Sequence, residues 1–485
     1  MKKQIGISMI FCLGYIAAAA LGLSGWQTAA GILLCAVACG LAVLFYMESR
    51  WILDYRVILS LFWLGGEGIA ALQLSNLQQP WNVRTWAAFG LFYLVYLWGW
   101  GLGSVLRNRR SDGKDHLTGS RRKSSGSPKN IDSGQTQGIS GGQRMAMAEK
   151  KEMIERIYAS IRLVALVSMA CFLAEVFIMG YIPLFSEDTH AYNYFHVTGI
   201  HYFTFSCMLV HPLTLIYVME GGRPEIKRIG MLILWNVLAL SIPILCISKF
   251  QFILTLLLPV MVYLLYKRTI PWKKILPGAA LLGVVAVVIF VFMTSQRNYE
   301  DGYLNQIFNM KNPAMPLPLQ YVYMYIANNY DNFNCLAEAI CEGQASFAYG
   351  RKELFPVFAL TGLKFVFPQL VNFPVFSTIA ELNTLTILYD AYYDFGLVGC
   401  GMFGGILGLA CSFLTSLVSK AKNPVSYLFY GQVAMYLLLS FFSTWFSNPT
   451  TWFWLAITWM LYVYIGGYWK KALSDRRNQT GTKQA

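Results

Sequence analysis

Long apolar stretches recur along most of the chain, and charged residues gather in the segments between them. The hydrocarbon core of a bilayer is about 30 Å thick, so a spanning helix needs roughly 20 mostly apolar residues. Stretches of this kind lie near residues 4–23, 27–47, 56–75, 84–105, 159–181, 199–219, 230–247, 250–267, 275–294, 395–418, 426–446 and 450–469. The pattern therefore predicts an all-α integral membrane protein with about twelve transmembrane helices.

Composition agrees with a membrane protein and argues against a soluble one. The 485 residues are 56% hydrophobic and 13% charged, and their mean hydropathy is +0.47. A soluble domain carries about 25% charged residues, and one this apolar would expose large adhesive patches. Most of the ten cysteines fall inside apolar runs, which indicates small core residues rather than a disulfide or zinc framework.

The distribution of basic residues predicts the orientation. If the N-terminus lies inside, 31 of the 38 lysines and arginines fall in or beside the inner segments. Because cytoplasmic loops carry such an excess, we expect a multi-pass protein of the cytoplasmic (inner) membrane with both termini in the cytoplasm. The net charge of +14 is then a signal of topology, and we expect no nucleic-acid partner.

Two segments between the predicted spans are much longer than the other connections, one predicted on the inner side and one on the outer side. The inner one is basic and rich in glycine and serine, so we expect a disordered solvated linker, with contact to anionic membrane lipids as the alternative. The outer one is too long for a connector and rich in proline and aromatic residues, so we expect it to fold on the outer face. The predicted parts are 1–105 (helices 1–4), 106–156 (basic cytoplasmic loop), 157–294 (helices 5–9), 295–394 (outer loop), 395–469 (helices 10–12) and 470–485 (cytoplasmic tail).

Motifs for nucleotide or metal chemistry are missing from the sequence. It contains no GxxxxGK[ST] phosphate loop, no HExxH, no GxSxG and no pair of aspartates two apart. We therefore expect no nucleotide cofactor, and a reaction here would need a substrate that arrives already activated.

Three of the few cations predicted on the outer side are candidates for holding an anion. Lys249 lies at a tight hairpin between two spans, Arg297 ends another span, and Arg351 follows in the outer loop. Arginine suits a bidentate phosphate contact and lysine supplies a point charge. The alternative is that these long side chains only reach toward the membrane interface.

Acids and histidines on the same side are candidates for proton transfer. Asp394 lies four residues after Asp390, so the two would share a helix face, and a carboxylate at such a site can act as a general base. The alternative for Asp394 is a helix N-cap for the span that follows it. The spacing of His190, His196 and His201 fits no metal site. His196 is therefore a candidate for hydrogen bonding or general-base catalysis instead. Glu67 lies within a span, where an acid is costly, so we expect it to be paired inside the bundle.

Several short motifs occur in order between about residues 160 and 445. They are GYIPLF at 180–185, GIHYF at 199–203, SKF at 248–250, SQR at 295–297, YMYIANNYDNF at 323–333, FAYGR at 347–351 and YDAYYDFGLVG at 389–399. In these motifs the chain resembles the oligosaccharide repeat-unit polymerases, the Wzy-type O-antigen and capsular polysaccharide polymerases. It departs from them at Lys249, where they often have arginine.

The resemblance implies a metal-independent glycosyltransferase related to the GT-C-type fold, with its site in an outer cavity under the large loop. It implies a polyprenyl-pyrophosphate glycan as substrate (undecaprenyl pyrophosphate as carrier), joined into O-antigen, capsule or exopolysaccharide, with a chain-length regulator and a flippase as partners. The cations would neutralise the pyrophosphate, Asp394 or a loop acid would activate the acceptor, and aromatic rings would stack on sugars. The residues so implicated are Asp394, Arg297 and Arg351 in catalysis, and Lys249, Asp331, His196, Tyr325 and Tyr330 in substrate binding.

Three other functions remain open at this point, namely a flippase, an O-antigen ligase and a structural scaffold for a cell-wall complex. A flippase for the same lipid-linked repeat would also have about twelve helices, but it would not need a folded outer loop and should show an internal repeat, which we do not find. An O-antigen ligase would use the same donor and a different acceptor.

The charge distribution generates the first testable prediction. A cysteine placed at Ser124 should react with a membrane-impermeant maleimide only from the cytoplasmic side, and one at Gln344 only from the outer side, in a background without the native accessible cysteines. Labelling of position 344 from the cytoplasm alone would overturn the orientation.

Overall fold

The computed structural model describes residues 2–118, 141–188, 191–222, 225–267, 307–419 and 421–467. These residues are mostly helical and form no strand beyond one isolated bridge between Ser75 and Met310. The expected all-α membrane class is confirmed, because eight described helical segments are long and apolar enough to cross a membrane. They are α1 (Lys2–Leu23), α2 (Gln27–Ser49), α5 (Val83–Thr118), α6 (Gly141–Met179), the run of α8 (Ile200–Thr204), η4 (Phe205–Leu209) and α9 (Val210–Met219), α10 (Ile226–Leu245), α11 (Lys249–Tyr266) and α17 (Tyr389–Ser419).

The other four expected spans have different outcomes. The stretch at 56–75 forms α3 (Tyr55–Leu59), the π-helical turn η1 (Ser60–Leu64) and α4 (Gly65–Ala71). The stretches at 426–446 and 450–469 form α18 (Val425–Leu438) and α19 (Pro449–Ile465), joined through the 3-10 turn η7 (Trp445–Ser447). The stretch at 275–294 lies outside the described residues, so the total of twelve stays a prediction.

The boundaries expected for the inner loop were too wide. α5 continues to Thr118 and α6 begins at Gly141, so both flanks of the 106–156 segment are helical. Good helix-forming residues explain part of this extension, since lysine, glutamate, methionine and arginine dominate the start of α6. Glu152 and Arg156 also form an i,i+4 ion pair of 2.8 Å there. The central residues 119–140 of the predicted disordered loop lie outside the described part.

The segment expected to fold outside the membrane does fold over its described residues, 307–388. It contains α14 (Leu317–Cys341), α15 (Phe355–Leu360), α16 (Leu363–Val366), η5 (Pro368–Leu370) and η6 (Ala380–Leu382). α14 packs on α4, and α15 packs on α19. Two short elements, η3 (Pro183–Phe185) and α7 (Ala191–Tyr194), lead from α6 into α8.

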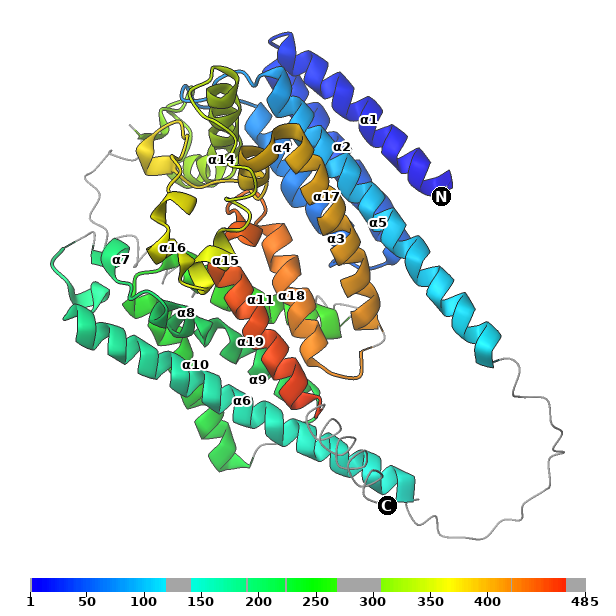
Figure 1. The fold of residues 1–485 in the computed structure, drawn as a ribbon, viewed down its shortest axis with the longest axis vertical. Coiled ribbons are helices and arrows are strands. Elements are labelled where there is room, and N and C mark those ends of the chain that lie inside the picture. The colour runs from blue at the N-terminus through cyan, green and yellow to red at the C-terminus, as the bar shows by residue number, and fades with distance from the viewer. Residues whose placement is uncertain are drawn as a thin grey trace.

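The long helices run roughly parallel or antiparallel (Figure 1). The start of α1, the end of α5, the start of α6 and the end of α19 point toward the lower right, whereas α14 lies at the upper left. The ends that the charge count places in the cytoplasm therefore share one side of the molecule. Which side faces the cytoplasm stays a prediction.

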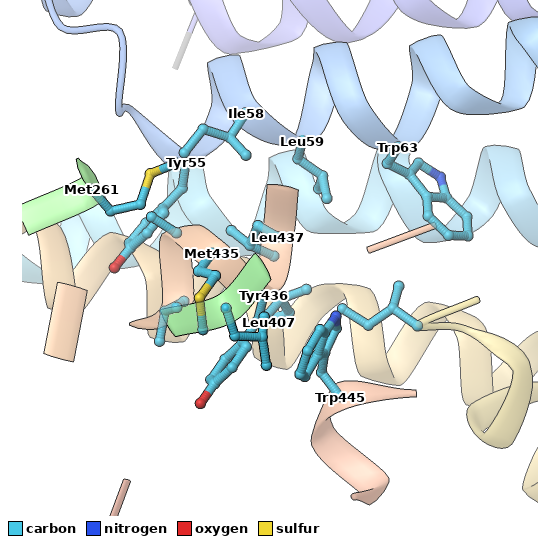
Figure 2. Close-up of a cluster of buried hydrophobic side chains, with 14 of the residues drawn as sticks. Tyr55, Ile58, Leu59, Trp63, Met261, Leu407, Met435, Tyr436, Leu437 and Trp445 are labelled. Atoms are coloured by element: carbon cyan, nitrogen blue, oxygen red, sulfur yellow. The ribbon is translucent and has the colours of Figure 1, made fainter. Parts of the chain in front are cut away.

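Buried aromatic side chains fill the centre of the bundle. The rings of Tyr55 and Tyr430 stack with centroids 4.0 Å apart, and each hydroxyl donates to a backbone carbonyl, that of Tyr55 to Tyr430 at 3.1 Å. Figure 2 shows Tyr55, Trp63, Tyr436 and Trp445 in this core. The hydroxyl groups of Tyr55 and Tyr430 are thus paired, which offsets the cost of burying a polar group away from water.

Glu67 is paired within the bundle, as expected. It is fully buried in α4 and accepts a hydrogen bond of 2.5 Å from the hydroxyl of Tyr15 on α1. The ten cysteines are all free, and four of them, Cys207, Cys246, Cys400 and Cys411, are buried in the bundle.

α5 and α17 approach each other more closely than side chains would allow. A β-carbon added at Gly404 would collide with the carbonyl oxygen of Phe92, and one at Gly408 with that of Tyr96. Glycines spaced four apart permit such backbone contact between membrane helices. This contact matters for the site described next, because the N-terminal end of α17 carries the acids of that site.

The close approach generates a stability prediction with a matched control on the same helix. Gly408→Ala should lower the melting temperature of the detergent-purified protein, because overpacking against backbone costs about 1–3 kcal/mol. Gly401→Ala should be tolerated, since its added methyl would meet only Leu91 at 3.6 Å. Equal melting temperatures for the two variants would contradict the proposed contact.

Candidate functional site

The break in α17 sets the geometry of the candidate site. Phe395 and Gly396 interrupt the helix, and Gly396 has φ +60° and ψ −138°, a conformation that only glycine adopts without strain. The first turns of α17 therefore end at Asp394, six residues into the helix. The boundary expected at residue 395 between the outer loop and the next span coincides with this break.

Residues 348–354, which we call the outer-loop turn, are fastened to that broken end. The side chain of Asp394 accepts hydrogen bonds from the backbone N–H groups of Lys352 (3.0 Å) and Glu353 (2.8 Å). Ala348 and Tyr349 donate backbone hydrogen bonds to the carbonyls of Tyr393 and Asp394. Asp394 is fully buried, so its hydrogen bonds cap the turn and hold it against α17.

Asp390, one turn earlier on α17, contacts both the outer-loop turn and η7. Its carboxylate forms an ion pair of 3.0 Å with the ammonium group of Lys352 and accepts a hydrogen bond from the hydroxyl of Ser447 in η7. The expected common face of Asp390 and Asp394 is thus realised, and both acids contact the outer-loop turn. We call Asp390, Asp394, Lys352 and Glu353 the carboxylate cluster.

Glu353 is the acid of this cluster that the sequence analysis missed. It is half-buried, and its pKa is raised from 4.5 to about 8, first by burial and then by the charges of Asp390 and Asp394, with Lys352 acting in the opposite direction. A carboxyl whose pKa lies near neutral pH is suited to proton transfer. Only its place beside Arg351 in the motif FAYGRKE could have drawn attention to it.

Arg351 lies beside the cluster on the same turn. Its Nε donates to the carbonyl of Ala348 at 2.8 Å, and its guanidinium lies 4.8 Å from the ring centroid of Phe373. The side chain is half-buried and forms no ion pair with any acid in the described part of the chain. The ring and the carbonyl hold Arg351 in place and leave its terminal N–H groups for another partner.

An aromatic bridge connects two more predicted residues through η7. Lys249 begins α11, and the ring of the next residue, Phe250, lies 4.8 Å from Phe442 and 5.5 Å from Trp445. The ring of Tyr325 on α14 stacks on Phe442 at 5.8 Å and is 39% exposed. Because η7 contains both Trp445 and the Ser447 that bonds Asp390, it joins this bridge to the carboxylate cluster.

Two predicted residues of α14 lie in the core instead. Tyr330 is fully buried, and its hydroxyl donates to the carbonyl of Trp63 at 2.7 Å. Asp331 is 2% exposed and accepts hydrogen bonds from Gln78 (2.7 Å) and Trp81 (2.8 Å). Burial raises the pKa of Asp331 to about 7, although both of these hydrogen bonds act to lower it. Neither side chain is placed to reach a sugar.

The histidines His196 and His201 lie just before and at the start of α8. His196 is exposed, and its ring centroid lies 6.1 Å from that of His201. His201 contacts a buried acid that the sequence analysis missed, Glu175 of α6, at 2.9 Å. Glu175 also accepts hydrogen bonds from the hydroxyl of Thr204 and the backbone N–H of Val197. These contacts fasten the start of the α8 segment to α6.

The third predicted cation, Arg297, lies outside the described residues, so its position relative to Arg351 stays a prediction. In the described ranges, no three histidine, cysteine, aspartate or glutamate side chains are grouped in a way that could hold a metal ion.

Comparison with known proteins leaves the family open. No protein-family model, no curated protein and no solved structure matches this chain. The resemblance to repeat-unit polymerases therefore depends on the motifs alone.

Proposed function

We propose that the chain is a polymerase of the cytoplasmic membrane that joins polyprenyl-pyrophosphate-linked oligosaccharide repeat units into a surface polysaccharide. It would have twelve spanning helices in a GT-C-like arrangement, both termini in the cytoplasm, and its site on the outer face. The observation that supports the proposal is the outer-loop turn, in which Arg351 stands two positions before Glu353, a carboxyl whose pKa is raised to about 8.

The negative charge of the leaving group explains why the proposed site needs the cation Arg351. In the proposed reaction a hydroxyl oxygen of the new repeat attacks the anomeric carbon of the growing chain, and the bond from that carbon to the pyrophosphate oxygen breaks. Negative charge then develops on the polyprenyl pyrophosphate, where fixed arginine groups lower the barrier. Arg351 supplies such a group, and Arg297 and Lys249 are the other proposed contributors.

The acceptor hydroxyl must lose a proton in the same step. We assign this proton to Glu353 rather than to Asp394, because both oxygens of Asp394 already accept backbone hydrogen bonds. Asp394 then acts as a positioning residue that holds the outer-loop turn. The half-buried Glu353 can exchange its proton with a substrate or with solvent.

The aromatic bridge is the proposed platform for the glycan. Tyr325 offers a partly exposed ring continuous with Phe442, and such faces suit the apolar faces of sugars. Tyr330 has no exposed surface and takes no part. His196 and Asp331 are not needed for this mechanism.

An assay of the purified protein with a lipid-linked repeat unit tests the proposed function. A ladder of polymers on a gel supports a polymerase. Movement of the lipid between leaflets without new glycosidic bonds would replace it with a flippase, and transfer only to a foreign acceptor would replace it with a ligase.

Arg351→Ala should reduce polymer formation about 10²–10³-fold, the usual cost of losing one strong donor to a developing charge. Lys311→Ala is the matched control, because Lys311 is an exposed cation of the same outer segment and should retain wild-type activity. Protein abundance in membranes should be equal for both variants. Full activity of Arg351→Ala would remove the guanidinium from the mechanism.

Glu353→Gln should reduce the rate about 10²–10⁴-fold, the range for loss of a general base. The wild-type rate should rise with pH around a midpoint near 8, since only the ionised carboxyl accepts a proton, and this rise should be absent in the variant. The unfolding free energy should fall as pH rises from about 4.5 to about 8, because the unfolded chain releases the proton first. A wild-type pH profile in Glu353→Gln would contradict the assignment.

Asp394→Asn should lower the stability of the protein as well as its activity. The amide can accept one of the two backbone hydrogen bonds, but its NH₂ group faces the other N–H, so the turn should loosen at a cost of about 1–3 kcal/mol. Protease cleavage within 348–354 should therefore increase. Lost activity with an unchanged cleavage rate would instead favour a direct role of Asp394 as the base.

A further inference from the structure

A polar cavity lies at the end of the bundle opposite the carboxylate cluster. Its volume is about 580 Å³, within the range of sites for small molecules. It opens between the start of α1, the end of α2, the start of α3, the second half of α5 and the end of α17. The lining residues are Gln4, Glu48, Ser49, Arg50, Trp51, Asp54, Arg56, Trp100, Ser104, Arg107, Thr415 and Ser419.

Arg56 is the fixed element of this cavity. It is only 6% exposed, and its guanidinium makes a bidentate contact with Asp54 at 3.1 and 2.8 Å. Glu48 lies 3.3 Å away, and the ring centroids of Phe45 and Trp100 each lie 4.8 Å from the guanidinium carbon. A buried charge needs such partners, so Arg56 is neutralised and held rigidly by its own neighbours.

Two further arginines give the cavity an excess of positive charge. With Arg56 matched by Asp54, the remaining lining charges are Arg50, Arg107 and Glu48, a net charge of one positive. Arg107 donates to the backbone carbonyl and hydroxyl of Ser412 on α17 through one terminal nitrogen. Arg50 is exposed at the end of α2 and forms no ion pair with the acids of the described residues.

These charges fit a phosphodiester, which carries a single negative charge and presents two oxygens to a guanidinium fork. The surroundings indicate a lipid as its source. Met47, Leu106 and Leu417 follow the same helices beside the cavity, and each is a large exposed apolar residue. A headgroup in the cavity would leave its acyl chains on this apolar surface.

We propose that this cavity binds the phosphodiester headgroup of an anionic membrane phospholipid. The site lies at the far end of α17 from the carboxylate cluster and serves a different ligand from the proposed polymerase substrate. A lipid there would join the ends of α1, α2, α5 and α17, which otherwise meet around a polar opening.

The test measures the melting temperature of the full-length, detergent-purified protein during titration with phosphatidylglycerol. We expect a saturable increase with phosphatidylglycerol, and no increase with phosphatidylcholine or with inorganic phosphate at the same concentration. An equal shift with phosphatidylcholine would show general lipid binding, and an equal shift with inorganic phosphate would show a soluble ligand; either result would overturn the proposal.

Charge variants identify the site. The double variant Arg50→Asn, Arg107→Gln should raise the half-saturating concentration of phosphatidylglycerol at least about 10-fold, in line with the loss of two charge-assisted contacts. Asparagine is chosen at position 50 because the residue has φ +54°, which asparagine tolerates. Arg162→Gln, which removes an exposed cation of α6 outside the cavity, should behave as wild type.

If loss of the Arg107 contact prevents folding, Arg50→Asn alone decides the question, since the Arg50 side chain is exposed and should not be needed for folding. It should still weaken the phosphatidylglycerol effect by about three-fold or more. Wild-type titration curves for this variant, or an equal loss in Arg162→Gln, would assign the lipid effect to the general surface charge.

Discussion

The outer site depends on two hydrogen bonds, those from the backbone N–H groups of Lys352 and Glu353 to the buried carboxylate of Asp394. Hydrogen bonds to a charged group contribute about 1.5–3 kcal/mol each. The outer-loop turn is otherwise joined to α17 mainly through the Lys352–Asp390 ion pair and the backbone contacts of residues 348 and 349. Without the Asp394 carboxylate, the turn that carries Arg351 and Glu353 would lose its two charge-assisted hydrogen bonds to α17.

Further contacts connect the outer-loop turn to the long helices of the bundle. The break at Gly396 aims the first turns of α17 toward the outer-loop turn, and the glycine contact with α5 fixes the helix beyond the break. η7 adds a third connection, because Ser447 bonds Asp390 while Trp445 packs on Phe250. The proposed reacting groups thus belong to loops, but helices determine where those loops lie.

Hydrophobic length was sufficient to predict the membrane class and eight candidate spans, and the aromatic content of the long segment was sufficient to predict that it folds. The end of α18 could not be predicted in this way. The helix ends at Leu438 although the apolar sequence continues, because apolar length does not show where a buried chain turns.

That Glu67 is paired could be expected, because an unpaired acid in a span is costly. Its partner Tyr15 could not be predicted, since the contact joins different helices. Glu353 escaped notice because its raised pKa comes first from burial and then from the charges of Asp390 and Asp394, and both causes exist only in the folded chain. Tyr330 was misplaced because aromatic residues favour cores and sugar sites alike.

The manner in which Asp394 holds its loop also affects how the sequence can change over time. The carboxylate contacts the peptide groups of residues 352 and 353 and not their side chains. Those two positions can therefore accept many side chains without losing the turn, and only proline, which lacks an N–H group, is excluded by this contact. Evolutionary drift in the loop would leave its shape intact, so related proteins could keep this architecture after their sequences have diverged beyond detection.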